Sequence, residues 1–136
     1  MQSVTAEELI EQFENGTLPA ESFRHGDHVR MAFEYFSKFP LLEVLERFPA
    51  ALTRFATRQG KPGLYHETIT WAFLLLIRER MARMGGKPIW EEFAAANADL
   101  LGKKETILKK YYSEETLKSV LARGTFLLPD RVLPID

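Results

Sequence analysis

All three histidines of this 136-residue chain stand just before apolar runs. His25 and His28 lie three positions apart in "FRHGDHVRMAF", and His66 stands in "YHETIT". The positive end of a helix dipole disfavours the imidazolium, so histidines at helix starts are expected to be neutral near pH 7. A neutral imidazole can ligate a metal or act as a general base. We therefore expect any chemistry of this chain at these two helix starts.

Two classes of ligand suit these residues. The three histidines with one carboxylate, from Glu67 or Asp27, would make a four-ligand set for Zn²⁺, Fe²⁺ or Ni²⁺. The free amides at a helix start would instead suit a small acidic ligand, such as a carboxylate or phosphate. The expected metal ligands are His25, His28, His66 and Glu67, and the expected ligand-binding residues add Thr70 and Arg123 to these four. Arg123 would serve as a carboxylate clamp.

Standard catalytic motifs are absent from the sequence. A zinc-peptidase helix that began at His66 would need a second histidine at position 70, which holds Thr70. There is no His-Asp dipeptide, G-x-S-x-G motif, phosphate-binding loop or dinucleotide fingerprint. The chain has no cysteine, which excludes thiol catalysis and zinc knuckles. The sequence leaves open whether the protein is an enzyme. It equally allows the histidines to be structural residues that only form hydrogen bonds at helix ends.

The elements that must position these residues are predicted to be helices. Thr5 and Glu8 form a capping box in which Glu8 is expected to reach the Thr5 amide, and Gly16 is expected to end this first helix. The second helix is expected to begin at Asp27 as its N-cap, or else near Ser22. Under either alternative the imidazoles of the second helix can converge.

Proline residues and turns divide the rest of the chain. A helix is predicted over residues 41–59, where Pro49 implies a kink or two short helices. "GKPG" at 60–63 is a turn, and a helix is predicted from about Tyr65 to Met84. Its centre is apolar on all sides, which is typical of the central, most buried helix of a bundle. Shorter helices are expected over 89–98, 103–111 and 114–123, the last of them capped by Ser113. We predict one all-α, single-domain helical bundle over residues 1–136, with the Pro-containing tail "FLLPDRVLPID" extended across it.

Charge and composition argue against several partners. The 18 Lys and Arg residues nearly balance the 19 Asp and Glu residues, so no nucleic-acid or membrane partner is expected. The basic stretch "KKETILKKYY" at 103–112 is interpreted as a solvated helix face. The longest apolar run, "WAFLLLI", is too short to cross a bilayer, and the acidic start "MQSVTAEELIEQF" does not resemble a signal peptide. We expect a soluble, cytoplasmic protein.

A second hypothesis requires no chemistry. The apolar tail, or a face formed by Leu41, Leu42 and Leu45, would support dimerisation or the docking of a partner. The histidines would then be structural and would only satisfy hydrogen bonds at helix ends. Arg123 would then pin the tail through an ion pair with Asp99 or Asp130. A homo-oligomer is compatible with this alternative.

Three stretches of the chain belong together by resemblance. "F-x-H-x-x-H-V" from Phe23, "YHETIT" and "AR-x-x-FL-x-PD" resemble a family of small uncharacterised bacterial proteins. The resemblance covers the chain from about Phe23 to Asp130. It implies no activity, cofactor or catalytic residue.

Overall fold

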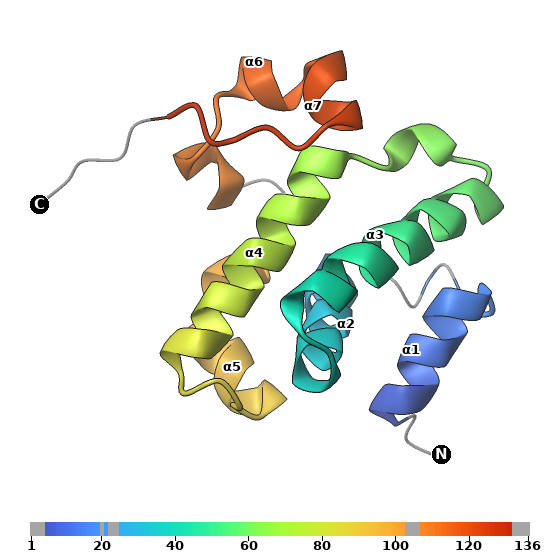
Figure 1. Cartoon of the computed structure of the whole chain (residues 1–136), viewed down its shortest axis with the longest axis vertical. Coiled ribbons are helices and arrows are strands. Elements are labelled where there is room, and N and C mark those ends of the chain that lie inside the picture. The colour runs from blue at the N-terminus through green and yellow to red at the C-terminus, as the bar shows by residue number, and fades with distance from the viewer. Residues whose placement is uncertain (1–4, 20, 22–24, 103–106, 132–136) are drawn as a thin grey trace, which may run out of the picture.

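The computed structural model describes residues 5–19, 21, 25–102 and 107–131. Over these residues the chain consists of helices packed together, with no strand, so the all-α prediction is confirmed (Figure 1). The α-helices are α1 (Ala6–Asn15), α2 (His25–Lys38), α3 (Leu41–Arg58), α4 (Glu67–Arg83), α5 (Trp90–Ala96), α6 (Glu114–Leu117) and α7 (Val120–Gly124). Short 3-10 turns lie between them: η2 (Pro62–Leu64), η3 (Ala98–Leu100) and η4 (Ile107–Lys110). None of the described helices is long and apolar enough to cross a membrane.

The first helix has the capping predicted for it, with one difference. The Glu8 amide donates to the Thr5 hydroxyl oxygen at 3.1 Å. The Glu8 carboxylate accepts from the same hydroxyl at 3.0 Å and not from the Thr5 amide as expected. Gly16 ends the helix with a φ of 82°, a left-handed conformation that side chains with a Cβ disfavour. Ile10 and Phe13 then face the core.

The predicted N-cap of α2 is wrong, and one of the two alternatives predicted for α3 is excluded. The helix α2 already includes His25, so Asp27 lies exposed in its first turn and is not the N-cap. The alternative start at Ser22 falls outside the described residues. The helix α3 continues through Pro49 and is not divided into two short helices. Of the three residues of the predicted Leu face, Leu42 is 78% exposed, and Leu41 and Leu45 are half-buried.

Helix α4 is the centre of the molecule, as predicted. It contacts α2, α3, α7 and η4, and Figure 1 shows it between the N-terminal helices and the C-terminal ones. Ile69, Phe73 and Ile77 repeat every four residues, Leu74 stands three residues before Ile77, and all four are buried. Its outer face is not apolar throughout, because Arg78 and Glu79 are exposed.

The C-terminal part is more broken than predicted. In place of a helix over 103–111 there is only η4, and residues 103–106 lie outside the described residues. The predicted helix over 114–123 is two helices, because the Ser119 hydroxyl accepts from the Ala122 amide at 3.0 Å and starts α7. The predicted cap at Ser113 is confirmed, with its hydroxyl 3.1 Å from the Thr116 amide.

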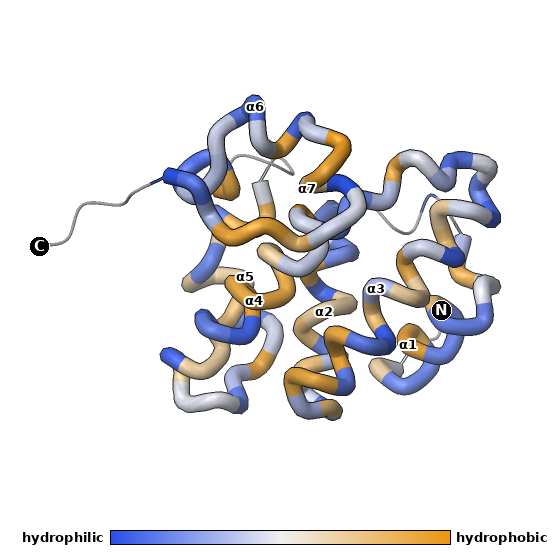
Figure 2. The backbone as a smooth tube through the Cα atoms, turned by 45° about the horizontal axis from the view of Figure 1, so that its top comes forward, coloured by the Kyte–Doolittle hydropathy of each residue, from blue (hydrophilic) through white to orange (hydrophobic). Residues whose placement is uncertain are grey.

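The described part of the tail, residues 125–131, is extended and lies against the start of α4. The Leu127 amide donates to the Thr68 hydroxyl at 3.1 Å, and Phe126 stacks on Trp71 with ring centroids 5.5 Å apart. The Tyr112 hydroxyl donates to the Leu127 carbonyl at 2.7 Å. Figure 2 shows this apolar segment crossing near α6 and α7. The predicted tail placement is confirmed for these residues.

The predicted ion pairs of Arg123 are wrong. Asp99 instead pairs with both terminal nitrogens of Arg80, each at 3.0 Å. Asp130 instead accepts from the Ser113 amide and hydroxyl, both at 2.8 Å, and from the Thr116 hydroxyl at 2.5 Å. These hydrogen bonds, Thr116 foremost, lower the pKa of Asp130 to about 2. Each aspartate therefore finds donors that lie nearer to it than Arg123.

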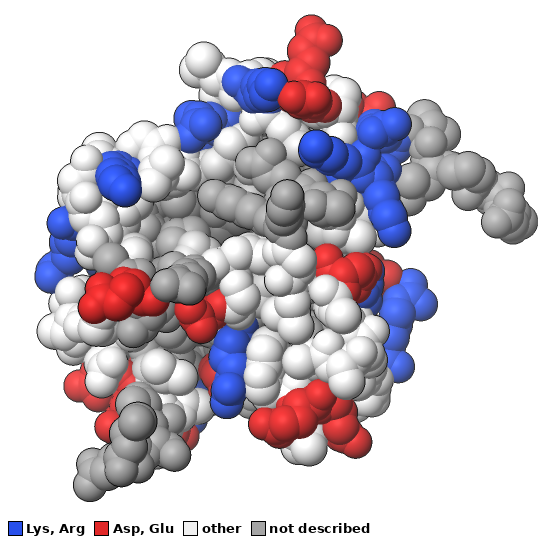
Figure 3. Space-filling view, turned by 180° about the vertical axis from the view of Figure 1, so that it is seen from behind, with Lys and Arg blue, Asp and Glu red and all other residues white. Residues whose placement is uncertain are grey.

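Acidic and basic side chains alternate over the rear face of the molecule (Figure 3). Most pairs are short-range, such as Arg30 with Glu34 and Arg83 with Glu79, each one helical turn apart. Such exposed pairs contribute at most a few tenths of a kcal/mol each. The visible face thus agrees with the balanced charge of the sequence.

Candidate functional site

A pocket of about 370 Å³ lies among α2, α3, α4 and the connection between α3 and α4. All three histidines contribute to its wall. The full lining consists of His25, His28, Val29, Ala32, Phe48, Leu52, Phe55, Ala56, Gln59, Lys61, Leu64, Tyr65, His66, Ile69, Thr70, Phe73, Leu74 and Ile77. The pocket is thus mainly apolar with a few polar groups, which is the usual make-up of a small-molecule site.

The floor of the pocket is apolar and deeply buried. Val29 of α2 and Leu74 and Ile77 of α4 are each 1% exposed, and Phe48 of α3 is 3% exposed. Helical spacing explains the arrangement, because positions three and four apart share a face and three helices turn such faces toward one another. An apolar group placed here would leave water completely.

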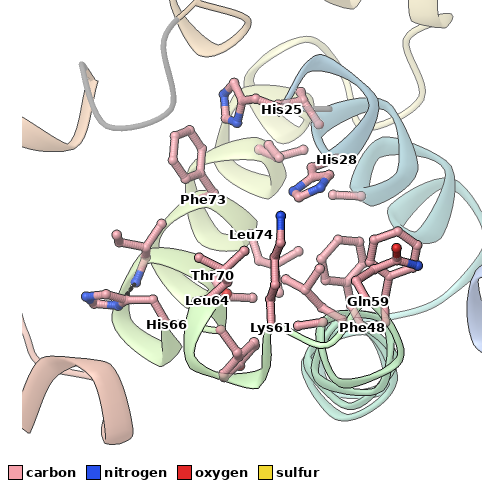
Figure 4. Close-up of a pocket in the computed structure, with 18 residues that line it drawn as sticks. His25, His28, Phe48, Gln59, Lys61, Leu64, His66, Thr70, Phe73 and Leu74 are labelled. Atoms are coloured by element: carbon pink, nitrogen blue, oxygen red, sulfur yellow. Dashed lines mark hydrogen bonds between the residues drawn. The ribbon is translucent and has the colours of Figure 1, made fainter. Parts of the chain in front are cut away.

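The rim is formed by the connection between α3 and α4. Gln59 caps α3, Gly60 turns the chain with a φ of 73°, and Lys61 and Leu64 follow as exposed residues that line the pocket. Figure 4 shows the Lys61 side chain extending toward His28.

The charge of Lys61 has no partner within the described part of the chain. No described residue forms a hydrogen bond or an ion pair with its ammonium group, and the lining contains no Asp or Glu. Other exposed cations of the chain, such as Lys87, also lack an acidic partner. Lys61 differs from them in standing over an apolar pocket. The electrostatic character of the rim is therefore positive.

His25 is held at the first turn of α2. Its Nε2 lies 2.9 Å from the Leu100 carbonyl oxygen, so that nitrogen carries the hydrogen and donates it. Its ring stands edge-on to Phe73, with centroids 5.0 Å apart. His28 follows one turn later on the same helix, half-buried. Both histidines of α2 therefore line the same pocket.

His66 is the N-cap of α4, and both of its ring nitrogens are engaged. The Ile69 amide donates to Nδ1 at 3.1 Å, and Nε2 donates to the Leu117 carbonyl at 2.7 Å. This pattern requires the neutral ring with its hydrogen on Nε2, and it joins α4 to α6. Figure 4 shows the ring pointing away from His25 and His28. His66 therefore forms wall and cap, and no ring lone pair remains for a ligand in this arrangement.

Of the two other predicted residues of α4, Thr70 lines the pocket and Glu67 does not. Glu67 does not line the pocket, and its carboxylate accepts from the Tyr65 hydroxyl. Burial, and then this hydrogen bond, raise the pKa of Tyr65, so the phenol stays protonated. Thr70 is buried in the pocket wall.

Arg123 lies outside the pocket, behind its rim. It donates to the Gly63 carbonyl and lies 3.4 Å from the Tyr65 carbonyl. The residue predicted as a carboxylate clamp thus contacts the backbone of the α3–α4 connection.

The metal centre expected from the sequence stays a prediction. The predicted ligands His25, His28 and His66 line one pocket, but Glu67 lies outside it. Within the described ranges, no group of three or more His, Cys, Asp or Glu side chains is arranged to hold a metal ion.

Sequence reasoning missed the contributions of α3 and of the connection after it. Lys61 stands in "GKPG", which was interpreted only as a turn, and Gln59 was not considered. Phe48, Leu52 and Phe55 were recognised as an apolar stripe, but nothing in a stripe distinguishes a pocket wall from filled core. The signal that could have pointed to Lys61 is its position in a short turn between two helices whose apolar faces meet.

Comparison with family models, with curated proteins and with solved structures finds no match to this chain. The resemblance of the three sequence stretches to a bacterial family stays a prediction. The function must therefore be argued from the site itself.

Proposed function

We propose that this protein binds a small organic acid with an apolar body. The acid group would lie at the rim near Lys61 and His28, and the body would lie on the floor formed by Val29, Leu74 and Ile77. The observation that carries the proposal is an ammonium group over an apolar pocket that has no acidic partner among the described residues. A bound carboxylate would supply the missing charge.

The dimensions of the pocket restrict the ligand further. About 370 Å³ is at the lower end of the range typical of small-molecule sites, about 300–1,000 Å³. A single ring or a short alkyl chain with one acid group fits this size, whereas a dinucleotide or a haem does not. The depth of the apolar floor favours a ligand that enters with its apolar end first.

The polar groups of the wall support the same orientation. Gln59, Lys61 and His28 stand near the rim, while the most deeply buried lining residues are aliphatic or aromatic. A carboxylate placed on the floor would lose its hydration without gaining a donor, which is strongly unfavourable. At the rim it gains a charge-assisted hydrogen bond and keeps contact with water.

The proposal is tested by calorimetric titration with octanoate and with octanol, which share the alkyl chain and differ in charge. We expect octanoate to bind at least about tenfold more tightly, since a hydrogen bond to a charged group contributes about 1.5–3 kcal/mol. Lys61→Met should reduce octanoate affinity to about that of octanol. Lys87→Met, at an exposed lysine outside the pocket, is the matched control and should leave both affinities unchanged.

Two results would contradict the proposal. One is equal affinity of the wild-type protein for octanoate and octanol. The other is octanoate binding that survives Lys61→Met unchanged, which would place the acid elsewhere on the molecule.

A further inference from the structure

Residues 60–65, the mouth turn, carry the rim of the pocket. The turn is closed internally by the Leu64 amide donating to the Lys61 carbonyl at 3.0 Å and the Tyr65 amide donating to the Pro62 carbonyl at 3.3 Å. Most of its residues are exposed, and none of their apolar side chains belongs to the core. The start of the turn is tied to α3 by the Lys61 amide, which donates to the Ala56 carbonyl at 2.9 Å. The exposed second half, which follows Lys61, is the part that a contact from another element can fix further.

A side chain from the far end of the chain contacts this turn from behind. The Arg123 guanidinium donates to the Gly63 carbonyl and approaches the Tyr65 carbonyl, residues about sixty positions earlier in the sequence. Arg123 makes no ion pair with a described residue. Its charge is thus directed at the backbone on either side of Leu64.

The helix that presents Arg123 is itself tied to α4. The Ala122 carbonyl lies 2.7 Å from the Thr68 hydroxyl, and Ala122 is fully buried. The Ser119 hydroxyl caps the helix, and the Arg123 amide donates to the Ser119 carbonyl at 3.3 Å. Arg123 therefore extends from a helix that is anchored to α4, whereas the mouth turn that it contacts is exposed.

We propose that Arg123 is a positioning residue for the acid site: by holding the carbonyls of Gly63 and Tyr65, it fixes the mouth turn with Lys61 over the pocket. This inference rests on the proposed function. It differs from a carboxylate clamp, since Arg123 does not line the pocket and acts on the ligand only through Lys61. A positioning role predicts an effect on the acid group of the ligand and none on its apolar body.

A double-mutant cycle on Lys61 and Arg123 tests this coupling, with octanoate and octanol as probes. Arg123→Met should weaken octanoate about two- to tenfold, the value of one net hydrogen bond, and leave octanol unchanged. In the Lys61→Met background it should have no further effect on octanoate. Arg123→Lys, which can still donate to the carbonyls, should restore most of the affinity.

The matched control is Arg131→Met. Arg131 also donates to a backbone carbonyl, that of Lys109, but away from the pocket. It should leave both affinities unchanged. Hydrogen exchange of the Leu64 amide in the ligand-free protein gives an independent measurement, because this amide closes the mouth turn. Exchange should become faster with Arg123→Met and not with Arg131→Met.

Several outcomes would overturn the inference while leaving the proposed function intact. In binding, Arg123→Met would leave the wild-type preference for octanoate unchanged, or would weaken octanoate and octanol equally. In the double-mutant cycle, the effects of Lys61→Met and Arg123→Met on octanoate affinity would be additive. In hydrogen exchange, Arg123→Met would leave the rate at the Leu64 amide unchanged. Wild-type protein that does not prefer octanoate would overturn the proposed function, and the inference would fall with it. The two failures are thus distinguishable.

Discussion

Two polar regions border helix α3, one around Arg47 and one around Lys61. Arg47 is surrounded by partners: two of its nitrogens contact Glu14 at 2.8 and 2.9 Å, and a third contacts Glu43 at 2.8 Å. The Tyr35 hydroxyl also donates to Glu14, at 2.7 Å. Lys61 has no such partner within the described residues. The Arg47 region pairs its charges within the fold and joins α1 to α2 and α3, whereas the Lys61 region is the one that we propose binds an acid.

The electrostatics of the Arg47 region agree with this contrast. The hydrogen bond from Arg47 is the main cause that lowers the pKa of Glu14, outweighing the opposing effect of burial. Burial, and then the hydrogen bond to Glu14, raise the pKa of Tyr35. The Arg47 guanidinium also lies 4.1 Å from the Phe39 ring centroid. Every polar group there is therefore held by folding alone.

The comparison predicts opposite effects of removing the two cations. Arg47→Met should lower the free energy of unfolding by about 2 kcal/mol, because it leaves a partly buried Glu14 unpaired. Lys61→Met should change it by less than about 0.5 kcal/mol, as is usual at an exposed site without a partner. Urea unfolding measures both. Similar losses of unfolding free energy in the two variants would show that Lys61 also stabilises the fold and would contradict the distinction.

A second comparison concerns two of the histidines, because His66 caps α4 while His28 lines the pocket near Lys61. His66→Ala removes an N-cap and leaves the Leu117 carbonyl without its donor, so we expect a loss of about 1–2 kcal/mol in the free energy of unfolding. His66→Asn can still accept from the Ile69 amide and should recover part of this loss. His28→Ala should cost less stability and weaken octanoate more than His66→Asn does. Thermal unfolding with and without octanoate checks both, and the reverse order would contradict the assignment of His66 to the wall.

The smallest effect is expected at Asp130, an exposed carboxylate satisfied by its own neighbours. Its pKa of about 2 in the folded chain is below the usual value of about 3.9. Its contribution to stability is therefore present above about pH 4 and is lost as the pH falls through about 2. Urea unfolding of the wild-type protein and Asp130→Asn at several pH values should give a difference that shrinks over this interval. A difference that stays constant with pH would contradict it.

Local signals in the sequence predicted much of the fold. The hydroxyls of Thr5 and Ser113 cap helices as expected, Gly16 ends α1, and all three histidines lie at helix starts that face one pocket. These features depend on neighbours within one or two helical turns. The division of residues 114–123 at Ser119 was missed because a serine within a helical pattern also fits a continuous helix.

Long-range contacts could not be predicted in the same way. Arg123 was assigned to Asp99 or Asp130 by charge alone, yet its partners are carbonyls about sixty residues away. The role of Lys61 depends on how three helices meet, which spacing along one helix does not specify. The candidate pocket was thus located by its histidines, while the acid binding that we propose for it depends on a lysine that the sequence placed only in a turn.

The most direct test of the account is an isotope-filtered NOE measurement on the protein with bound octanoate. We predict contacts from the terminal methyl of octanoate to the methyls of Val29, Leu74 and Ile77. We predict contacts from the methylene next to the carboxylate to the Lys61 side chain. Contacts of the methyl with exposed residues such as Leu121 or Leu128, with none to the pocket floor, would contradict the account.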